Sequence, residues 1–168
     1  SEVESSEAES SEESSEAPET EGSKFTVYAV DQKDGTVGKS VRLDGSSTPT
    51  TNYISEWLGV NIINPSSAGR RNFGVPFEVP ALTAADSVKV EIYARGQGRS
   101  KVSIVDADQN VIGSSVTIPS DWNALKEVAY TYEFSGDEIS DGTYYASFYE
   151  DNDYINIWKI VVTITSIS

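Results

Sequence analysis

From Lys24 onward the chain is built of short segments in which apolar and polar side chains alternate, separated by clusters of Gly, Pro, Asp and Asn. Side chains that alternate with a period of two lie on opposite faces of a β-strand, so each segment predicts a strand with one buried face. No amphipathic helix is expected beyond a turn near residues 121–126. The expected strands are 24–30, 37–43, 73–79, 87–95, 100–106, 110–118, 127–134, 143–150 and 154–165.

The segments between these strands carry turn sequences such as KDG, RGQG, DADQN and EDND. Many short strands at this spacing, with no alternation of strands and helices, are typical of an antiparallel two-sheet β-sandwich. A chain of this size is long enough to bury a core between two sheets. The sequence therefore predicts an all-β fold, with one sandwich domain over residues 23–168.

Residues 1–22 differ from the rest because they are almost entirely Ser and Glu. They hold nine Glu and no basic residue, and so supply most of the formal net charge of −15. The like charges of this segment repel each other. Its apolar area is also too small for burial to offset the entropy that would be lost on ordering it. We interpret residues 1–22 as a disordered Ser/Glu-rich linker, which implies that the domain is one module of a longer chain. A tail that binds a basic partner is the alternative.

The residue types that are absent exclude several classes of function. The chain has no Cys and no His, so it has no Ser-His-Asp triad, thiol nucleophile or Cys/His zinc site. Its 12 basic residues are scattered among 27 acidic ones, which disfavours a nucleic-acid partner. No apolar run is long enough to cross a bilayer, so no membrane insertion is expected.

The segment YYASFYEDNDYINIW, residues 144–158, places six aromatic side chains around an acidic turn. If Asp151 and Asn152 are the central residues of a two-residue turn, Tyr149 lies opposite Tyr154, and the pairing continues in steps of two. Phe148 and Tyr144 then face the core. The residues expected on the outer face of this hairpin are Tyr145, Ser147, Tyr149, Tyr154, Asn156 and Trp158.

Two further features bear on this outer face. Beyond Trp158 the apolar positions change phase to Ile160 and Val162, so a β-bulge is expected near Trp158–Lys159. The strand 87–95 also has a polar face, which would add Glu91, Tyr93 and Arg95 to the surface if this strand lay beside the hairpin. The sequence does not place it there.

Flat rings interleaved with polar side chains match the two kinds of surface on a sugar, because C–H groups can lie on a ring while hydroxyls need donors and acceptors. We therefore expect a neutral polysaccharide ligand. The alternative is that a loop covers these rings, which then form a second small core. The expected ligand-binding residues are Tyr145, Tyr149, Tyr154, Trp158 and Tyr93 for stacking, with Asn156, Ser147, Glu91 and Arg95 for hydrogen bonds.

Three segments carry a resemblance to a known family: VKVEIYARGQGRSKVSIVDADQNVI, IPSDWNALKEVAYTYEF and DGTYYASFYEDNDYINIWKIVVTI. They resemble parts of the β-sandwich (jelly-roll) carbohydrate-binding modules of bacterial plant-polysaccharide hydrolases such as xylanases, over the C-terminal half of the chain. The resemblance implies a non-catalytic module that targets an appended glycoside hydrolase, in the same full-length chain, to xylan or another β-linked plant glycan. Related sandwiches often hold a structural calcium ion, whose ligands the sequence does not identify; no other cofactor is expected.

The Ser/Glu-rich spacer and the Thr/Tyr/Asn-rich composition favour an extracellular or cell-surface location in a bacterium. Two alternatives to this function remain open, a starch-binding module and a cell-surface adhesion or protein-binding sandwich. An enzyme is not expected, because no pair of carboxylates lies in the apolar context that glycoside hydrolysis needs to raise the pKa of one of them.

Other residues have structural and functional interpretations. Trp122 is expected to seal one end of the sandwich, and Arg70 and Arg71 to lie in a solvated loop or to contact sugar hydroxyls or uronates. Trp57 falls on the same side of an extended segment as Tyr53, where a core role and a site role are equally supported. The sequence DADQN has the alternating oxygens of a calcium loop but lacks its glycine, so a hairpin turn is expected.

Overall fold

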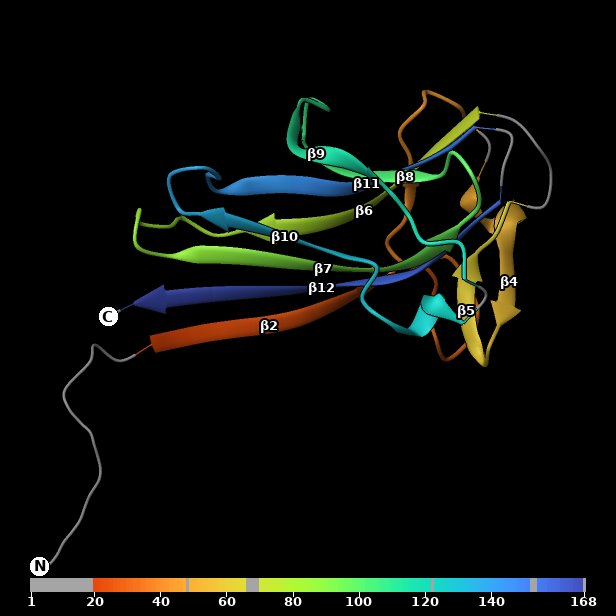
Figure 1. The fold of residues 1–168 in the computed structure, drawn as a ribbon, viewed down its shortest axis with the longest axis horizontal. Helices are drawn as coiled ribbons and strands as arrows, with labels where there is room; N and C mark the ends of the chain where they lie inside the picture. The colour runs from red at the N-terminus through yellow and green to blue at the C-terminus, as the bar shows by residue number, and fades with distance from the viewer. Residues whose placement is uncertain (1–19, 48, 66–69, 122, 152–153, 168) are drawn as a thin grey trace, which may run out of the picture.

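The alternating segments form two antiparallel β-sheets that pack face to face, as a computed structural model of the chain shows (Figure 1). The structure describes residues 20–47, 49–65, 70–121, 123–151 and 154–167. The six-stranded sheet contains β2 (Thr20–Tyr28), β4 (Ile54–Trp57), β5 (Val60–Ile63), β7 (Ser87–Gly96), β10 (Tyr130–Ser135) and β12 (Ile155–Ile167). The five-stranded sheet contains β3 (Val41–Arg42), β6 (Arg70–Val79), β8 (Lys101–Asp106), β9 (Val111–Thr117) and β11 (Gly142–Asp151).

The strand order confirms the predicted antiparallel sandwich. The first sheet runs β10-β7-β12-β5-β4, with β2 also paired to β12, and the second runs β3-β6-β11-β8-β9. From β6 onward the chain repeatedly crosses between the sheets, as in a jelly roll (Figure 1). The only helices described are two short 3₁₀ turns, η2 (Thr50–Tyr53) and η3 (Ala124–Lys126). No helix in the described ranges is long and apolar enough to cross a membrane.

The core lies between the sheets and follows the period-two pattern. In β7, Val88, Val90 and Ile92 are fully buried and alternate with polar residues. In β12 the register with β7 shifts between Ile157 and Lys159, which confirms the predicted bulge. The bulge lets the aliphatic side chains on both sides of it face the core. Burying each aliphatic side chain contributes roughly 1.5–3 kcal/mol.

A tyrosine connects the two sheets at the side where β10 and β9 are edge strands. Tyr132 of β10 lies with its hydroxyl 2.6 Å from the Ser114 carbonyl and 3.0 Å from that of Val102, both in the other sheet. Burial raises the pKa of the Tyr132 phenol.

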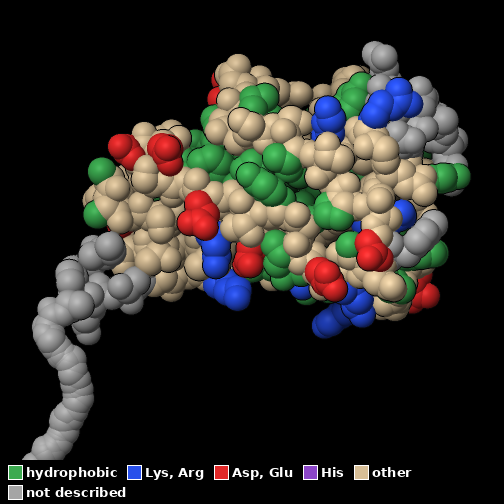
Figure 2. Space-filling model, viewed as in Figure 1, with side chains coloured by type: hydrophobic (Ala, Val, Ile, Leu, Met, Phe, Trp, Pro, Cys, Tyr) green, Lys and Arg blue, Asp and Glu red, His purple; other side chains and the backbone are tan. Residues whose placement is uncertain are grey.

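Figure 2 shows hydrophobic side chains in a band across the middle of this view, with acidic and basic side chains around it.

The predicted hairpin between residues 143–150 and 154–165 is wrong. β11 pairs with β6 and β8, so Tyr149 lies opposite Asn72 and Lys101 rather than opposite Tyr154. β12 pairs with β7, β2 and β5 in the other sheet. The chain therefore crosses the sandwich between β11 and β12, and residues 152–153 of the expected turn lie outside the described residues.

Other strand boundaries also differ from the expected ones. Residues 20–22, assigned to the linker by composition, begin β2, while residues 1–19 lie outside the described residues. The expected strand 37–43 is reduced to β3. β4 and β5 were not expected; they form a hairpin whose two turn residues, Leu58 (φ 51°) and Gly59 (φ 80°), both have positive φ. Leucine rarely adopts this conformation, so the usual Asn-Gly signal for such a turn is missing.

The crossing between the sheets can be tested with disulfides, because the native chain has no Cys. Ser147 and Ser103 are opposite each other in β11 and β8, where Cα atoms lie about 4.5–5.5 Å apart. The S103C/S147C variant should form an intramolecular disulfide under mild oxidation, measured by a thiol assay and mass spectrometry. The S147C/N156C variant, which the rejected hairpin would cross-link, should stay reduced; its efficient oxidation would contradict the topology.

Candidate functional site

The nine residues predicted to bind a ligand are divided between the two outer faces of the sandwich. The prediction that they share one face is therefore wrong. The strand 87–95 does lie beside 154–165, since β7 pairs with β12 and Arg95 is opposite Asn156. Six of the nine belong to the six-stranded sheet and its end: Glu91, Tyr93, Arg95, Tyr154, Asn156 and Trp158. The other three, Tyr145, Ser147 and Tyr149, belong to the five-stranded sheet.

Three rings surround a lysine on the outer face of the six-stranded sheet. Lys159 lies opposite Tyr28 of β2 and Tyr93 of β7, and Trp158 is the extra residue of the bulge beside it. The Lys159 Nζ atom is 4.0 Å from the centre of the Trp158 ring, 4.7 Å from that of Tyr93 and 5.8 Å from that of Tyr28. Together with Glu91, one step further along β7, these residues form what we call the aromatic platform.

The Trp158 and Tyr93 rings meet edge to face, with centroids 5.6 Å apart and planes at 84°. The Trp158 side chain is half-buried, and its Nε1–H is shielded from solvent without a hydrogen-bond partner in the described part of the chain. The nitrogen edge of the indole therefore faces the protein. A cation over an aromatic ring contributes about 0.5–1 kcal/mol at an exposed site, so Lys159 helps to hold the rings in place.

The Lys159 ammonium lies among aromatic rings and near another lysine, Lys24. Burial lowers the pKa of the Lys159 ammonium, and the positive charge of Lys24 lowers it further. Among the residues that the structure describes, no carboxylate forms an ion pair with Lys159. The platform thus combines exposed ring surface with an ammonium group that lies over it.

A pocket of about 190 Å³ lies at the end of the same face, which we call the end pocket; Trp57, Asn64, Arg95, Tyr154 and Asn156 line it. Trp57 comes from the tip of the β4–β5 hairpin, and Tyr154, just before β12, is 49% exposed. Arg95 and Asn156, which line the same pocket, are 1% and 4% exposed.

The buried Arg95 is held by two carbonyl-type acceptors. Its Nη1 donates to Asn156 Oδ1 at 2.7 Å, and its Nη2 donates to the Ser120 carbonyl at 3.1 Å. Burial lowers the pKa of the Arg95 guanidinium, and the nearby Asp121 opposes this shift. The Arg95–Asn156 pair therefore gives the end pocket a buried, hydrogen-bonded polar lining, which we call its polar floor.

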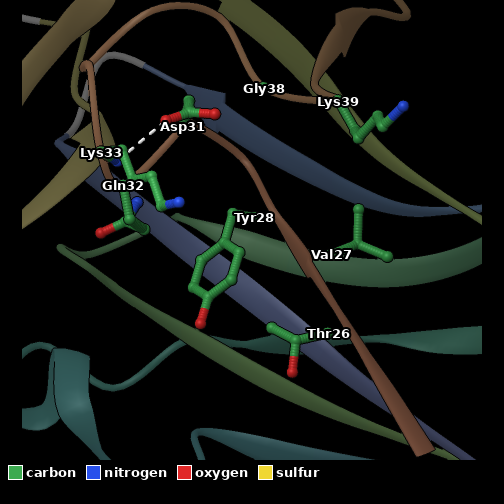
Figure 3. A pocket seen from close by; sticks show the side chains of 8 residues that line it. All are labelled: Thr26, Val27, Tyr28, Asp31, Gln32, Lys33, Gly38 and Lys39. Carbon is green, nitrogen blue, oxygen red and sulfur yellow. Dashed lines mark hydrogen bonds between the residues drawn. The ribbon is translucent and has the colours of Figure 1, made fainter.

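A second hollow borders the platform along the edge strand β2. It has a volume of about 520 Å³ and is shaped by β2 and the loop that follows it. Figure 3 shows Tyr28 and Thr26 projecting to the same side of β2, with the Gln32 and Lys33 side chains of the loop beside the Tyr28 ring. Tyr28 thus belongs to both the aromatic platform and this hollow, which adjoins the platform at the sheet edge.

Two of the three predicted residues on the opposite face, Ser147 and Tyr145, have partners there, and Tyr149 is half-buried. Ser147 is 6% exposed and its Oγ donates to Asn72 Oδ1 at 2.9 Å. Tyr145 and Leu43 pack against Gly74, where an added Cβ would lie 2.6 Å from Leu43 Cδ1 and 3.1 Å from Tyr145 Cδ1. The segment after β3 therefore covers part of this face, as the second-core alternative expects for covered rings.

The other candidates of the sequence have structural roles or fall outside the description. Arg71 is not in a solvated loop: it is part of β6, its Nε donates to the Tyr53 hydroxyl at 3.2 Å, and its Nη1 contacts the fully buried Glu150 at 3.5 Å. Asp106 accepts backbone N–H groups of Asp108 and Asn110, so DADQN is a hairpin turn.

The side chain of Arg70 and residue Trp122 lie outside the described parts of the chain. Within those parts there is no cluster of three or more His, Cys, Asp or Glu residues that could hold a metal ion. The ligands of a structural calcium ion are therefore still unassigned.

Four residues of the site were absent from the predicted set: Tyr28, Trp57, Asn64 and Lys159. Tyr28 could have been found, because Phe25 and Val27 alternate with it in KFTVYAV and point inward. Trp57 was recognised without a decision between core and site. Lys159 joins the outer face because the bulge places it there next to Trp158, which needs the partner strand to be known.

No protein-family model and no curated protein matches the chain. Solved structures similar to it include a mutant of a family 29 carbohydrate-binding module (14% identity, TM-score 0.43, 84% of this chain and 86% of that chain). Another is the carbohydrate-binding module of Cellvibrio mixtus lichenase 5A in complex with cellotriose (14%, TM-score 0.42, 82% and 95%). A third is a xylan-binding module of family 15 (12%, TM-score 0.37, 84% and 97%). At such low identities and TM-scores, function has to be argued from the site itself.

The polar floor of the end pocket gives a testable stability effect. Asn156→Ala would remove one acceptor of the buried Arg95 guanidinium, so we expect the free energy of unfolding to fall by about 1–3 kcal/mol in urea denaturation. Asn64→Ala, in the same pocket but half-buried, should change it by less than about 0.5 kcal/mol. Equal losses for both variants would show that the Arg95–Asn156 bond does not stabilise the floor.

Proposed function

We propose that this chain is a non-catalytic carbohydrate-binding module whose binding surface consists of the aromatic platform and the end pocket. The observation that carries the proposal is the gathering of partly exposed rings on one sheet face, next to the buried polar floor formed by Arg95 and Asn156. The five rings are Tyr28, Trp57, Tyr93, Tyr154 and Trp158. Scattered single aromatics are ordinary on a protein surface, but a contiguous group marks a binding site.

The chemistry of this surface suits a sugar chain. Axial C–H groups give a pyranose an apolar face that can lie on Trp or Tyr, while its hydroxyls need hydrogen-bonding groups at the rim. The Tyr28, Tyr93 and Tyr154 hydroxyls and the amides of Asn64 and Asn156 supply both donors and acceptors. A long, shallow surface with several weak contacts fits a polysaccharide better than a compact metabolite.

Among the described residues, the platform and the end pocket do not hold a pair of carboxyl groups. Hydrolysis of a glycosidic bond uses two carboxyl groups on opposite sides of the scissile bond. The platform and the end pocket as defined above contain one carboxylate, Glu91. This arrangement supports binding without catalysis.

The attached enzyme, the location outside the cell and the type of glycan are proposed from the sequence. The Ser/Glu-rich linker supports a module that tethers an appended glycoside hydrolase in the same chain, outside the cell, to a plant polysaccharide. Xylan or another β-linked glycan is the first candidate and starch the second. A cell-surface adhesion domain is the alternative from another class, and it would bind no glycan.

Affinity electrophoresis tests the proposal and the placement of the site together. The chain should be retarded in gels that contain one member of a panel of xylan, mixed-linkage glucan and starch. Trp158→Ala and Tyr154→Ala should each weaken retention by about two- to tenfold, the equivalent of about 0.5–1.5 kcal/mol per ring contact. The melting temperature of each variant shows whether it has kept its fold.

Tyr149→Ala provides the matched control, since Tyr149 lies on the opposite sheet. It should leave retention unchanged. A loss of retention in Tyr149→Ala alone would move the site to the five-stranded sheet. Unchanged mobility of the native chain in every gel would favour the adhesion alternative, and release of reducing ends would contradict the non-catalytic assignment.

A further inference from the structure

We infer that the aromatic platform selects an acidic glycan, one that carries uronic acid carboxylates, and that Lys159 is the group that pairs with them. This inference rests on the proposed function and narrows its ligand class. The sequence by itself favours a neutral polysaccharide; the placement of Lys159 within the platform changes that expectation.

The Lys159 ammonium lies where a ligand that stacks on Trp158 would meet it. Its Nζ atom lies over the Trp158 ring, 4.0 Å from the ring centre, so it occupies one face of the indole. A neutral sugar that stacks there must displace the ammonium and lose the cation–π contact without a replacement for it. A uronate displaces it as well, but offers a carboxylate as the new partner at the rim of the same sugar ring.

The surroundings of the Lys159 ammonium also favour a negatively charged ligand. Lys159 is half-buried, and the described residues provide no carboxylate for it. Glu91 lies on the next outward position of β7 and forms no ion pair with it. Partial burial strengthens an attraction between opposite charges, because less water screens it. A carboxylate that arrives with the ligand therefore finds a cation that is already positioned and only partly solvated.

Other lysines lie near the platform, although the chain is acidic. The chain as a whole is strongly acidic, with a net charge of −15. Two further lysines lie on outer positions near the platform: Lys24 on β2 and Lys89 on β7 are both opposite Thr163 of β12, and Lys89 also lies opposite Glu133 of β10. Lys33 and Lys39 line the adjoining hollow beside Tyr28, together with one acidic residue, Asp31. Lysines are thus present on several sides of the rings, in a chain whose acidic residues outnumber its basic ones.

The experiment compares two forms of one polymer, a glucuronic-acid-substituted xylan and the same xylan after chemical reduction of its carboxyl groups. Isothermal titration calorimetry at fixed ionic strength measures the affinity of the full chain for each. The native chain should bind the acidic form about two- to fivefold more tightly, the factor expected for one partly exposed ion pair.

Lys159→Gln makes the comparison specific to one side chain. It should weaken binding to the acidic polymer by the same factor, whereas binding to the reduced polymer should stay the same or become tighter, because the Trp158 ring face is uncovered. Lys101→Gln removes one positive charge from the opposite sheet, where Lys101 is exposed, and should affect neither polymer. Thermal melts of both variants show that the fold is kept.

The outcomes separate this inference from the proposed function. Equal affinity of the native chain for the two polymers, or an equal loss for both in Lys159→Gln, overturns the acidic-glycan assignment and leaves a carbohydrate-binding module. Equal losses in Lys101→Gln and Lys159→Gln would show a diffuse charge effect and also overturn it. Binding to neither polymer, nor to any member of the neutral panel, overturns both proposals.

Discussion

The platform depends on one irregularity in β12. Ile155 and Ile157 face the core before the bulge, and Ile160 and Val162 face it afterwards, which a regular strand with a period of two cannot achieve. The extra residue is Trp158. Because the bulge adds a residue opposite Tyr93, Trp158 and Lys159 lie together on the outer face. The bulge keeps aliphatic side chains of β12 in the core on both sides of it. It also places the Trp158 ring next to the Lys159 ammonium in the candidate site.

The second constraint is the separation of the two sheets. β11 and β12 are consecutive in the chain and rich in aromatics, yet each completes a different sheet. Their outward side chains therefore point away from each other, with the core between them. Arg71, Tyr53 and the buried Glu150 show that polar groups near the start of β6 are used for internal pairing. The outer face of the six-stranded sheet, which β7 and β2 complete, carries the rings of the aromatic platform.

The candidate site combines a rigid part with an exchangeable one. Arg95 and Asn156 are buried and hydrogen-bonded to each other, so the floor of the end pocket is organised before a ligand arrives. Lys159 and Tyr154 are more accessible, and the Lys159 ammonium rests on rings rather than on a carboxylate. A preorganised floor reduces the entropy lost on binding, while a weakly held cation can change partners at small cost. This division suits a weak, repeated contact along a polymer.

Alternation of apolar and polar residues predicted the sandwich, the inward and outward faces of β7 and β12, and the bulge at Trp158. These features could be predicted because they depend on residues that are neighbours in the chain. The alternation also identified six residues that do share the six-stranded sheet and its end. Which strands lie side by side was decided only by the tertiary structure. A short connection such as EDND is compatible with a hairpin and with a crossing between sheets, and the choice depends on pairing with β6, β8 and β7, which are distant in sequence. For the same reason Tyr28 and Lys159 became neighbours of Tyr93 only after folding, whereas Tyr145 and Tyr149 were separated from them.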